Sequence, residues 1–238
     1  MNKPKVSIVI PAHNEEAKIA ECLVSIQKYA AKAFEVIVVD NASADNTSTI
    51  TESFGFVKMV SEPRKGVMFA REKGWRESNG EIVAFIDADC RVVAGWIEQI
   101  ESEFDKDKNL AVLSGPYVYY DIPLWQRALC EMYFIFAMGI YCIVGYMAIF
   151  GNLAIRRSVL EKMSGLDTSI EFYGDDTDTA RRASRYGRVK FRYRFRIESS
   201  GRRICSQGLL SIAHIYSKNF FSEALFHKPS TKSSKDFR

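Results

Sequence analysis

The chain has 238 residues, of which 47% are hydrophobic and 26% are charged, with 14 Gly and 6 Pro. This balance is typical of a folded globular protein and excludes disordered, collagen-like and mucin-like chains. The 33 Lys and Arg exceed the 29 Asp and Glu and give a formal net charge of +4 at pH 7. At this length we expect one domain at 1–227 that divides into two halves near residue 115, followed by a polar, disordered tail at 228–238.

The first half of the chain alternates short apolar runs with helix-compatible stretches. Runs rich in Val and Ile, which predict strands, occupy 6–11, 35–40, 56–60, 81–87 and 110–115. Helices are predicted at 16–29, 45–53, 66–78 and 94–104, the second of them with Ser43 as its N-cap. Strands and helices in this order form a mostly parallel sheet covered on both faces. The predicted fold class is therefore α/β, with an open sheet flanked by helices.

The second half is less regular. Its pattern predicts an aromatic-rich helix at 123–145, a strand at 148–155, a helix after Arg157, an acidic loop near Gly174 and a helix at 176–186. Cations and apolar residues then alternate over 190–197, and this period of two predicts a strand with four cations on one face. The window 181–203 holds nine Arg and one Lys against one Glu, so we expect an anionic partner to meet it.

Residues 132–155 form a run of 24 positions without a charge. Because Gly151 and Asn152 interrupt the run, we expect its helical part to be 132–147, about 24 Å long at 1.5 Å per residue. That length is below the roughly 30 Å of a bilayer's hydrocarbon core. The run therefore favours a buried or interfacial helix, with a membrane span as the alternative.

The five cysteines are an odd number, without a C-x-x-C pair or a histidine at zinc-ligand spacing. Such cysteines are typical of a reducing compartment. Residues 1–5 lead directly into a predicted strand, without the apolar segment of a secretory signal peptide. We therefore expect a cytoplasmic protein.

Polar clusters follow three of the predicted strands, at 12–15, 40–43 and 87–89. Ligands of open α/β sheets bind beyond the carboxyl ends of the strands, so these clusters are expected to meet at one edge. Asp87 and Asp89 offer two carboxylates for a hard divalent cation that neutralises a diphosphate, and a structural turn is the alternative. The same D-x-D spacing at 105/107 falls at a charged helix end and indicates solvated surface.

Two common phosphate-binding motifs are missing after the first strand, the dinucleotide-binding G-x-G-x-x-G and the P-loop. A metal ion is therefore expected to hold any phosphates at this edge.

A second acidic centre lies at 173–178. Asp175 and Asp176 are adjacent at a predicted helix start, so one carboxylate can cap the helix while the other reaches into the cleft. The alternative is that both cap the helix and pair with Arg181 and Arg182.

In combination these motifs resemble glycosyltransferase family 2, whose members have the GT-A fold. The resemblance covers residue 5 to about residue 205 in the family's order and is carried by 6–15, 38–43, 66, 70–71, 85–89, 151–152 and 174–176. It implies an inverting, metal-dependent transfer of a sugar from a nucleotide-diphosphate sugar of the UDP or GDP type to an acceptor hydroxyl. The acceptor implied is a sugar, a lipid-linked molecule or a cell-envelope glycan, as in polysaccharide biosynthesis. Residues 1–115 would form the donor half and 116–227 the acceptor half.

The resemblance also implies roles for individual residues. The positions that match its donor-binding residues are Pro11, Ala12, Glu15, Asp40, Arg71, Asp87, Arg202 and Arg203. Asp87 and Asp89 match the Mg²⁺ or Mn²⁺ site, and 202–203 resembles a basic motif that closes over the diphosphate. Asp176 matches the catalytic base. The family has Glu-Asp more often than Asp-Asp here, so Asp175 stays open as the alternative base.

His214 lies on a predicted amphipathic C-terminal helix and is a candidate third metal ligand, with a surface or core histidine as the alternative. Aromatic side chains of the second half can form an acceptor platform, and core packing is the alternative for them. These side chains are Trp125, Tyr133, Phe134 and Tyr141.

Two other functions remain open from the sequence. One is a nucleotidyltransferase, and the other is a non-catalytic module that binds nucleic acid or an anionic membrane through the basic window. The favoured interpretation expects no nucleic-acid partner. It does predict peripheral contact with the anionic inner face of the cell membrane, through the basic window and the apolar helix.

Overall fold

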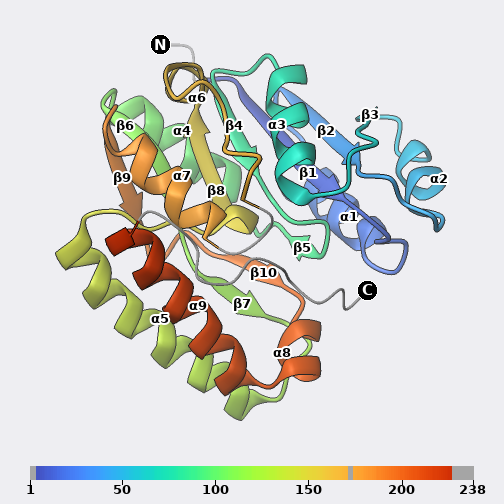
Figure 1. Cartoon of the computed structure of the whole chain (residues 1–238). Helices are drawn as coiled ribbons and strands as arrows, with labels where there is room; N and C mark the ends of the chain where they lie inside the picture. The colour runs from blue at the N-terminus through green and yellow to red at the C-terminus, as the bar shows by residue number, and fades with distance from the viewer. Residues whose placement is uncertain (1–3, 171–173, 227–238) are drawn as a thin grey trace.

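The structure is a computed structural model that describes residues 4–170 and 174–226. The tail predicted at 228–238 and position 173 of the acidic loop lie outside the described residues. Helices flank a central sheet, and a smaller sheet with two long helices lies beside it (Figure 1).

The central sheet has seven strands in the order β3-β2-β1-β4-β8-β6-β9. The strands are β1 (Val6–Ala12), β2 (Glu35–Asp40), β3 (Val57–Ser61), β4 (Ile82–Phe85), β6 (Leu110–Ser114), β8 (Leu153–Arg156) and β9 (Arg188–Phe191). The pairs β1–β2, β1–β4, β2–β3 and β6–β9 are parallel, whereas β8 runs antiparallel between β4 and β6. The predicted open, mostly parallel sheet is therefore confirmed.

Successive side chains of the central strands enter two separate cores because both faces of the sheet are covered. Ile8 packs with α1 (Ile19–Tyr29) and α4 (Trp96–Lys106) on one face. Val9 packs with α3 (Val67–Glu77), α6 (Arg157–Lys162) and α7 (Asp175–Ala183) on the other. The helices cover the two faces of the sheet, and the carboxyl ends of β1 and β4 lie at the sheet edge between these helical layers.

The second half adds a three-stranded sheet that the sequence analysis did not predict. Its order is β5-β10-β7, with β5 (Cys90–Arg91), β7 (Tyr117–Tyr119) and β10 (Ile197–Ser199). Helices α5 (Leu124–Val144), α8 (Arg202–Gln207) and α9 (Leu209–Phe226) accompany it, with α5 and α9 side by side in Figure 1. Strands of two or three residues carry too little periodicity to be read from sequence alone.

The remaining elements are α2 (Thr47–Glu52) and the 3₁₀ turn η1 (Phe150–Asn152). The prediction of Ser43 as N-cap of α2 is wrong, because the Ser43 hydroxyl accepts a hydrogen bond from the Asn14 amide instead. The Asp45 carboxylate accepts a hydrogen bond from the Thr47 amide at 3.0 Å, which satisfies the first backbone amide of α2. The strand predicted at 148–155 is shorter than expected because η1 occupies its first half.

The prediction of a strand over 190–197 with four cations on one face is also wrong. Strand β9 ends at Phe191, and the chain then turns so that Phe195 stacks on Trp96 in the core. The neighbouring cations pair with carboxylates of other elements: Lys190 with Asp107 at 3.1 Å, Arg192 with Glu103 at 3.1 Å, and Arg196 with Glu131 at 3.1 Å. Much of the basic window is therefore neutralised within the fold.

The prediction that residues 105 and 107 lie on the solvated surface is wrong for Asp107. Asp107 is buried and accepts hydrogen bonds from Arg188 and the Asn109 amide. Only Asp105, which pairs with Lys108 at 2.8 Å, keeps a surface position.

Helix α5 is longer than the 132–147 segment expected from the uncharged run. Its 21 residues span about 31 Å, because the helix begins at Leu124 and continues through Arg127 and Glu131. By length and composition, α5 is long and apolar enough to cross a membrane, with a mean hydropathy of 1.6 and only 17% of that window buried. The helix is thus largely exposed, so the buried half of the expectation is wrong, whereas an interfacial helix and a membrane span stay as predictions.

Asn152 connects η1 to α4 and to the segments that follow β6 and precede β10. Its side chain accepts from Trp96 at 2.9 Å and donates to the carbonyls of Gly115 and Phe195 at 3.2 and 2.7 Å. We expect Asn152→Ala to cost about 2 to 4 kcal/mol because it leaves buried polar groups without partners. The check is thermal unfolding, in which Tm should fall by roughly 5 to 15 °C. A decrease below 2 °C would show that water replaces the amide.

Candidate active site

A cavity lies at the carboxyl ends of β1 and β4, where the sequence predicted the polar clusters to meet. Its walls include Pro11, Glu15 and Asp87 from this edge, Asp176 from α7, and aromatic side chains of α5 and α9. The cavity therefore joins the predicted donor half to the predicted acceptor half.

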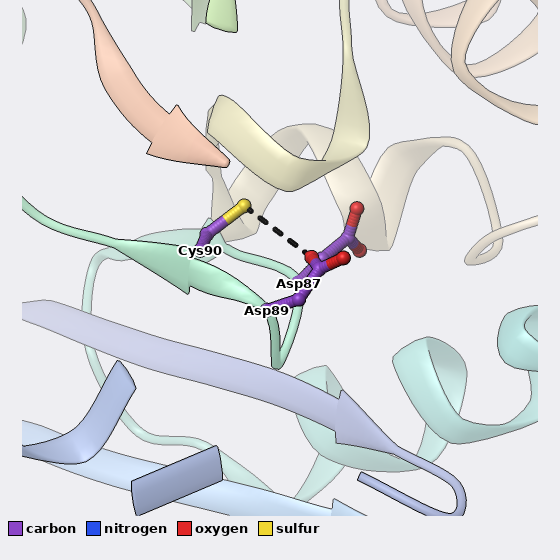
Figure 2. Close-up of side chains that lie close together, drawn as sticks. All are labelled: Asp87, Asp89 and Cys90. Atoms are coloured by element: carbon purple, nitrogen blue, oxygen red, sulfur yellow. Dashed lines mark hydrogen bonds between the residues drawn. The ribbon is translucent and has the colours of Figure 1, made fainter. Parts of the chain in front are cut away.

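The carboxylates that follow β4 form the candidate metal site. Among the described residues, Asp87, Asp89 and Cys90 bring one possible ligand atom each to within 4.8 Å of one another (Figure 2). Burial, and next the charge of Asp87, raise the pKa of Asp89 to about 6. Two carboxylates held this close repel each other, and a hard divalent cation between them removes that repulsion. These residues fit Mg²⁺ or Mn²⁺.

Cys90 was not among the predicted site residues, although it directly follows Asp89 in the sequence. Its thiol donates to the Asp89 carboxylate at 3.9 Å, as the dashed line in Figure 2 marks. Burial raises the pKa of the Cys90 thiol well above its usual value. The sulfur thus stays protonated, so the oxygens of Asp87 and Asp89 are the better ligands.

Arg71 connects the metal site to α7. Its guanidinium donates to Asp87 Oδ1 at 3.0 Å and to Asp175 Oδ2 at 2.7 Å, and lies 4.1 Å from the ring centroid of Phe150. The residue is 5% exposed and lines the cavity. It thereby fixes the carboxylate at the end of β4 relative to the first turn of α7.

The two adjacent carboxylates of α7 have different surroundings. Gly174 precedes them with φ of 90°, a left-handed conformation that favours glycine and turns the chain into the helix. Asp175 is buried and held by Arg71, whereas Asp176 accepts from the Thr177 amide at 2.8 Å. Burial, and next the charge of Asp175, raise the pKa of Asp176 to about 7. Asp176 is therefore the carboxylate suited to proton transfer near neutral pH.

The alternative in which Asp175 and Asp176 pair with Arg181 and Arg182 is wrong. Asp178 takes that position, at 2.6 Å from Arg181 and 3.5 Å from Arg182. Asp178 lies three residues before Arg181 and four before Arg182, so these side chains share one face of α7.

The predicted basic motif at 202–203 begins α8 and lies at the cavity. Arg202 contacts Glu15 at 2.5 Å and Asp89 at 3.3 Å, and Arg203 lines the same cavity. Both cations are thus next to the candidate metal site, where the phosphates of a nucleotide would lie.

Two other donor-binding predictions lie at the same sheet edge, beside the cavity lining. Ala12 is buried, and its carbonyl accepts from the Asn41 amide at 2.7 Å. Asp40 ends β2 opposite Ala12 and accepts from the Ser43 amide at 3.2 Å.

His214 is not brought to the metal site. It is exposed on α9 and is not part of the group that Asp87 and Asp89 form within the described residues. An amphipathic pattern does not show which site a helix faces. The sequence alone therefore could not exclude His214 as a metal ligand.

Tyr117 is a site residue that the sequence analysis missed. Its hydroxyl donates to Asp87 Oδ2 at 3.2 Å. A Cβ atom at Gly151 would lie 2.0 Å from this hydroxyl and 2.6 Å from Asp87 Oδ2. The glycine of the 151–152 motif was therefore the available signal, because it indicates a close approach between η1 and the site.

The sequence of this chain matches a known protein family. Residues 7–164 match the family described as Glycosyl transferase family 2. The chain belongs to glycosyl transferase family 2. The predicted resemblance is thus confirmed over about two thirds of the sequence.

The relatives include other glycosyltransferases. Glycosyltransferase AglE of Haloferax volcanii is 37% identical over 103 residues, which cover 40% of this chain and 34% of AglE. The probable glycosyltransferase YdaM of Bacillus subtilis is 31% identical over 188 residues, covering 69% of this chain and 43% of YdaM. The chain thus spans less than half of the length of these relatives.

Solved structures of glycosyltransferases share the fold. The mannosyltransferase PcManGT from Pyrobaculum calidifontis, in complex with GDP-Man and Mn²⁺, has a TM-score of 0.71 at 20% identity, covering 95% of this chain and 64% of PcManGT. TarS 1–349 of S. aureus has a TM-score of 0.66 at 16% identity, covering 93% of this chain and 72% of that chain. The fold is therefore of the GT-A type, as the sequence predicted.

We expect Arg71→Met to destabilise the family 2 domain, because the buried Asp175 carboxylate would lose its counter-ion. The expected cost is about 3 to 5 kcal/mol at pH 8, or roughly 10 °C in Tm. The matched control on the same helix is Arg76→Met, since Arg76 pairs with Glu72 and its side chain is 56% exposed. That exposed pair should contribute less than about 1 kcal/mol. Equal losses in both variants would contradict the role given to Arg71.

Proposed function

We propose that the protein is an inverting, metal-dependent glycosyltransferase that moves a sugar from a nucleotide-diphosphate sugar to an acceptor hydroxyl. The observation that carries the proposal is the meeting of three groups in one cavity: the Asp87 and Asp89 carboxylates, the 202–203 cations and Asp176. Each group meets a separate need of sugar transfer: metal binding, stabilisation of the leaving group and proton removal.

Asp87 and Asp89 would hold Mg²⁺ or Mn²⁺. When bound, this cation supplies Lewis-acid stabilisation of the negative charge on the diphosphate. Support comes from the structures of PcManGT in complex with GDP-Man and Mn²⁺ and of TarS 1–349 in complex with UDP-GlcNAc. A UDP or GDP sugar is therefore the proposed class of donor.

Asp176 accepts the proton of the acceptor hydroxyl as the hydroxyl oxygen forms its bond to the anomeric carbon. The bond from that carbon to the diphosphate breaks, and its electron pair remains on the phosphate oxygen. Arg202 and Arg203 stabilise this leaving oxygen. Because a single displacement occurs, the configuration at the anomeric carbon inverts.

The acceptor is a hydroxyl of a sugar or of a lipid-linked molecule, as in the synthesis of polysaccharides or cell-envelope glycans. We also propose a cytoplasmic location with peripheral contact at the inner face of the cell membrane. The apolar exposed surface of α5 supports this contact.

The test is thermal unfolding of the full chain with UDP, GDP, dTDP or CDP, each with Mn²⁺ and again with EDTA. A ligand at 100 times its Kd stabilises the folded state by about 2.7 kcal/mol, or roughly 5 to 10 °C at this chain length. We expect a metal-dependent shift with one nucleotide, which then selects the sugar donors for a transfer assay. The absence of a shift with all four nucleotides would refute the proposed donor site.

A further inference from the structure

Helix α5 carries an unbroken apolar face on the outside of the protein. The large side chains of this face are between 42% and 87% exposed. They are Trp125, Leu129, Met132, Ile135, Phe136 and Ile143, which we call the α5 stripe. Their spacing of three, four and seven residues places them on one side of the helix over almost its whole length.

The charged residues of α5 face the protein instead. Arg127 donates to the carbonyl of Tyr119 at 2.5 Å, and Glu131 accepts from Tyr193 and pairs with Arg196 at 3.1 Å. The helix therefore lacks the charged outer face of an ordinary surface helix. Such a surface indicates an apolar environment outside the protein.

The inner side of the same helix forms an apolar lobe of the active-site cavity. Tyr133, Phe134 and Ala137 of α5 line this lobe opposite Ile212 and Phe220 of α9. The Tyr133 hydroxyl bonds to Ser217 of α9, and burial, followed by the charge of Asp176, raises the pKa of Tyr133. Asp176 lines the same cavity, so the lobe adjoins this carboxylate.

The lobe and the stripe meet at Phe136. This side chain lines the cavity and is also 68% exposed as a member of the stripe. Phe136 thus links the cavity that Asp176 lines to the outer surface of α5. A water-soluble sugar acceptor does not require an apolar connection from the cavity to the outer surface.

We propose that the α5 stripe docks on a lipid bilayer and that the acceptor is a lipid-linked molecule whose hydrocarbon chain occupies the apolar lobe between α5 and α9. This inference rests on the proposed sugar transfer and specifies its acceptor. The head group of the lipid presents the reacting hydroxyl to Asp176, while its chain leaves past Phe136 into the bilayer.

The size of the stripe favours a bilayer over a second copy of the chain. The six side chains from Trp125 to Ile143 cover about 28 Å of helix, and at a helix width of about 10 Å the stripe covers roughly 300 Å². A stable protein interface buries about 800 Å² on each partner. The 192–196 turn, which pairs with Glu131 of α5, carries the exposed Arg194, and this cation matches an anionic lipid surface.

The first experiment is flotation of the full chain with vesicles of phosphatidylcholine and phosphatidylglycerol. The stripe variant is Trp125→Gln, Met132→Gln and Ile143→Gln, three positions that do not line the cavity. The matched control replaces exposed apolar residues of the donor half, Val24→Gln, Phe34→Gln and Phe56→Gln. We expect wild type and control to float and the stripe variant to float at least about tenfold less.

Three results would overturn the docking proposal: wild type that stays with the soluble fraction, a stripe variant that floats as well as wild type, or a wild-type dimer in sedimentation that the stripe variant abolishes. Nucleotide-induced thermal shifts of all three proteins are measured in parallel. Failure of the donor site would remove the shift from all of them and leave flotation unchanged, so the two proposals fail separately.

The second experiment follows the lipid chain itself. Vesicles are doped with a phospholipid that carries a photoactivatable group in its acyl chain, and the cross-linked positions are mapped. We expect label on the α5 stripe and also on the lobe positions Ile212 and Phe220 of α9. Label confined to the stripe would mean that the protein docks without admitting a lipid chain, and would overturn the acceptor assignment.

Discussion

Asp176→Asn is expected to lower the rate of sugar transfer by about 10²- to 10⁴-fold, because the variant cannot take the proton of the acceptor hydroxyl. The metal-dependent thermal shift with the donor nucleotide should persist, since the variant leaves Asp87 and Asp89 intact. Initial rates at saturating donor and acceptor provide the measurement. Full activity in the variant would exclude Asp176 as the base.

Asp175→Asn is the informative comparison. Asp175 is held by Arg71 at 2.7 Å, so its replacement should lower Tm as well as activity. Asp176→Asn should lower activity without lowering Tm. If the reverse pattern is found, Asp175 is the base.

The pH dependence of transfer follows from the raised pKa of Asp176. With a pKa of about 7, the carboxylate is protonated at pH 6 and ionised at pH 8, so kcat/KM should rise with pH and reach a plateau above about pH 8. The free energy of unfolding changes with pH in the opposite direction. The folded state holds this proton more tightly than the unfolded state, so the group's contribution to stability is lost as pH rises from about 4 to above 7. Relative to wild type, Asp176→Asn should therefore be more stable at pH 8 than at pH 5.

Asp89→Ala is expected to abolish the metal-dependent stabilisation by nucleotide. The loss should equal the wild-type shift, about 2.7 kcal/mol at 100 times Kd, because the metal site would lose one of its two carboxylates. The measurement is Tm with the selected nucleotide, in Mn²⁺ and in EDTA. Retention of more than half of the Mn²⁺-dependent shift would contradict the assigned site.

Two control variants make this result specific. Asp105→Ala removes a surface carboxylate from another D-x-D segment, and should leave the shift unchanged. His214→Ala tests the histidine that the sequence put forward as a third ligand. Since His214 is exposed on α9, we expect this variant to keep the full shift.

The first half of the chain was largely predictable because its signals are local. Apolar runs of four to seven residues form strands β1 to β4, and the polar residues after them, including Asp87, necessarily lie where those strands end. The family could also be recognised, since its motifs stand in order along the chain. For the long aromatic helix, the bounds 123–145 agree with the structure to within one residue at each end, whereas the bounds 132–147 taken from the uncharged run begin eight residues late.

Contacts between residues that are far apart in the sequence could not be predicted from local patterns. Arg71 joins Asp87 to Asp175, which is 104 positions away, and a pattern along one segment does not specify such a pair. The alternation at 190–197 predicted a strand, but burial of Phe195 against Trp96 stabilised a turn there.

The sequence by itself determined the α/β fold, the family and the strand-end carboxylates, because each depends on neighbouring residues and their order. Only the tertiary structure decided that both Asp175 and Asp176 line the cavity, with Asp175 held by Arg71 and Asp176 bonded to Thr177, that His214 lies on the surface, and that the apolar face of α5 points outward. Each of these depends on which elements pack together, and that is set by contacts between segments far apart in the chain.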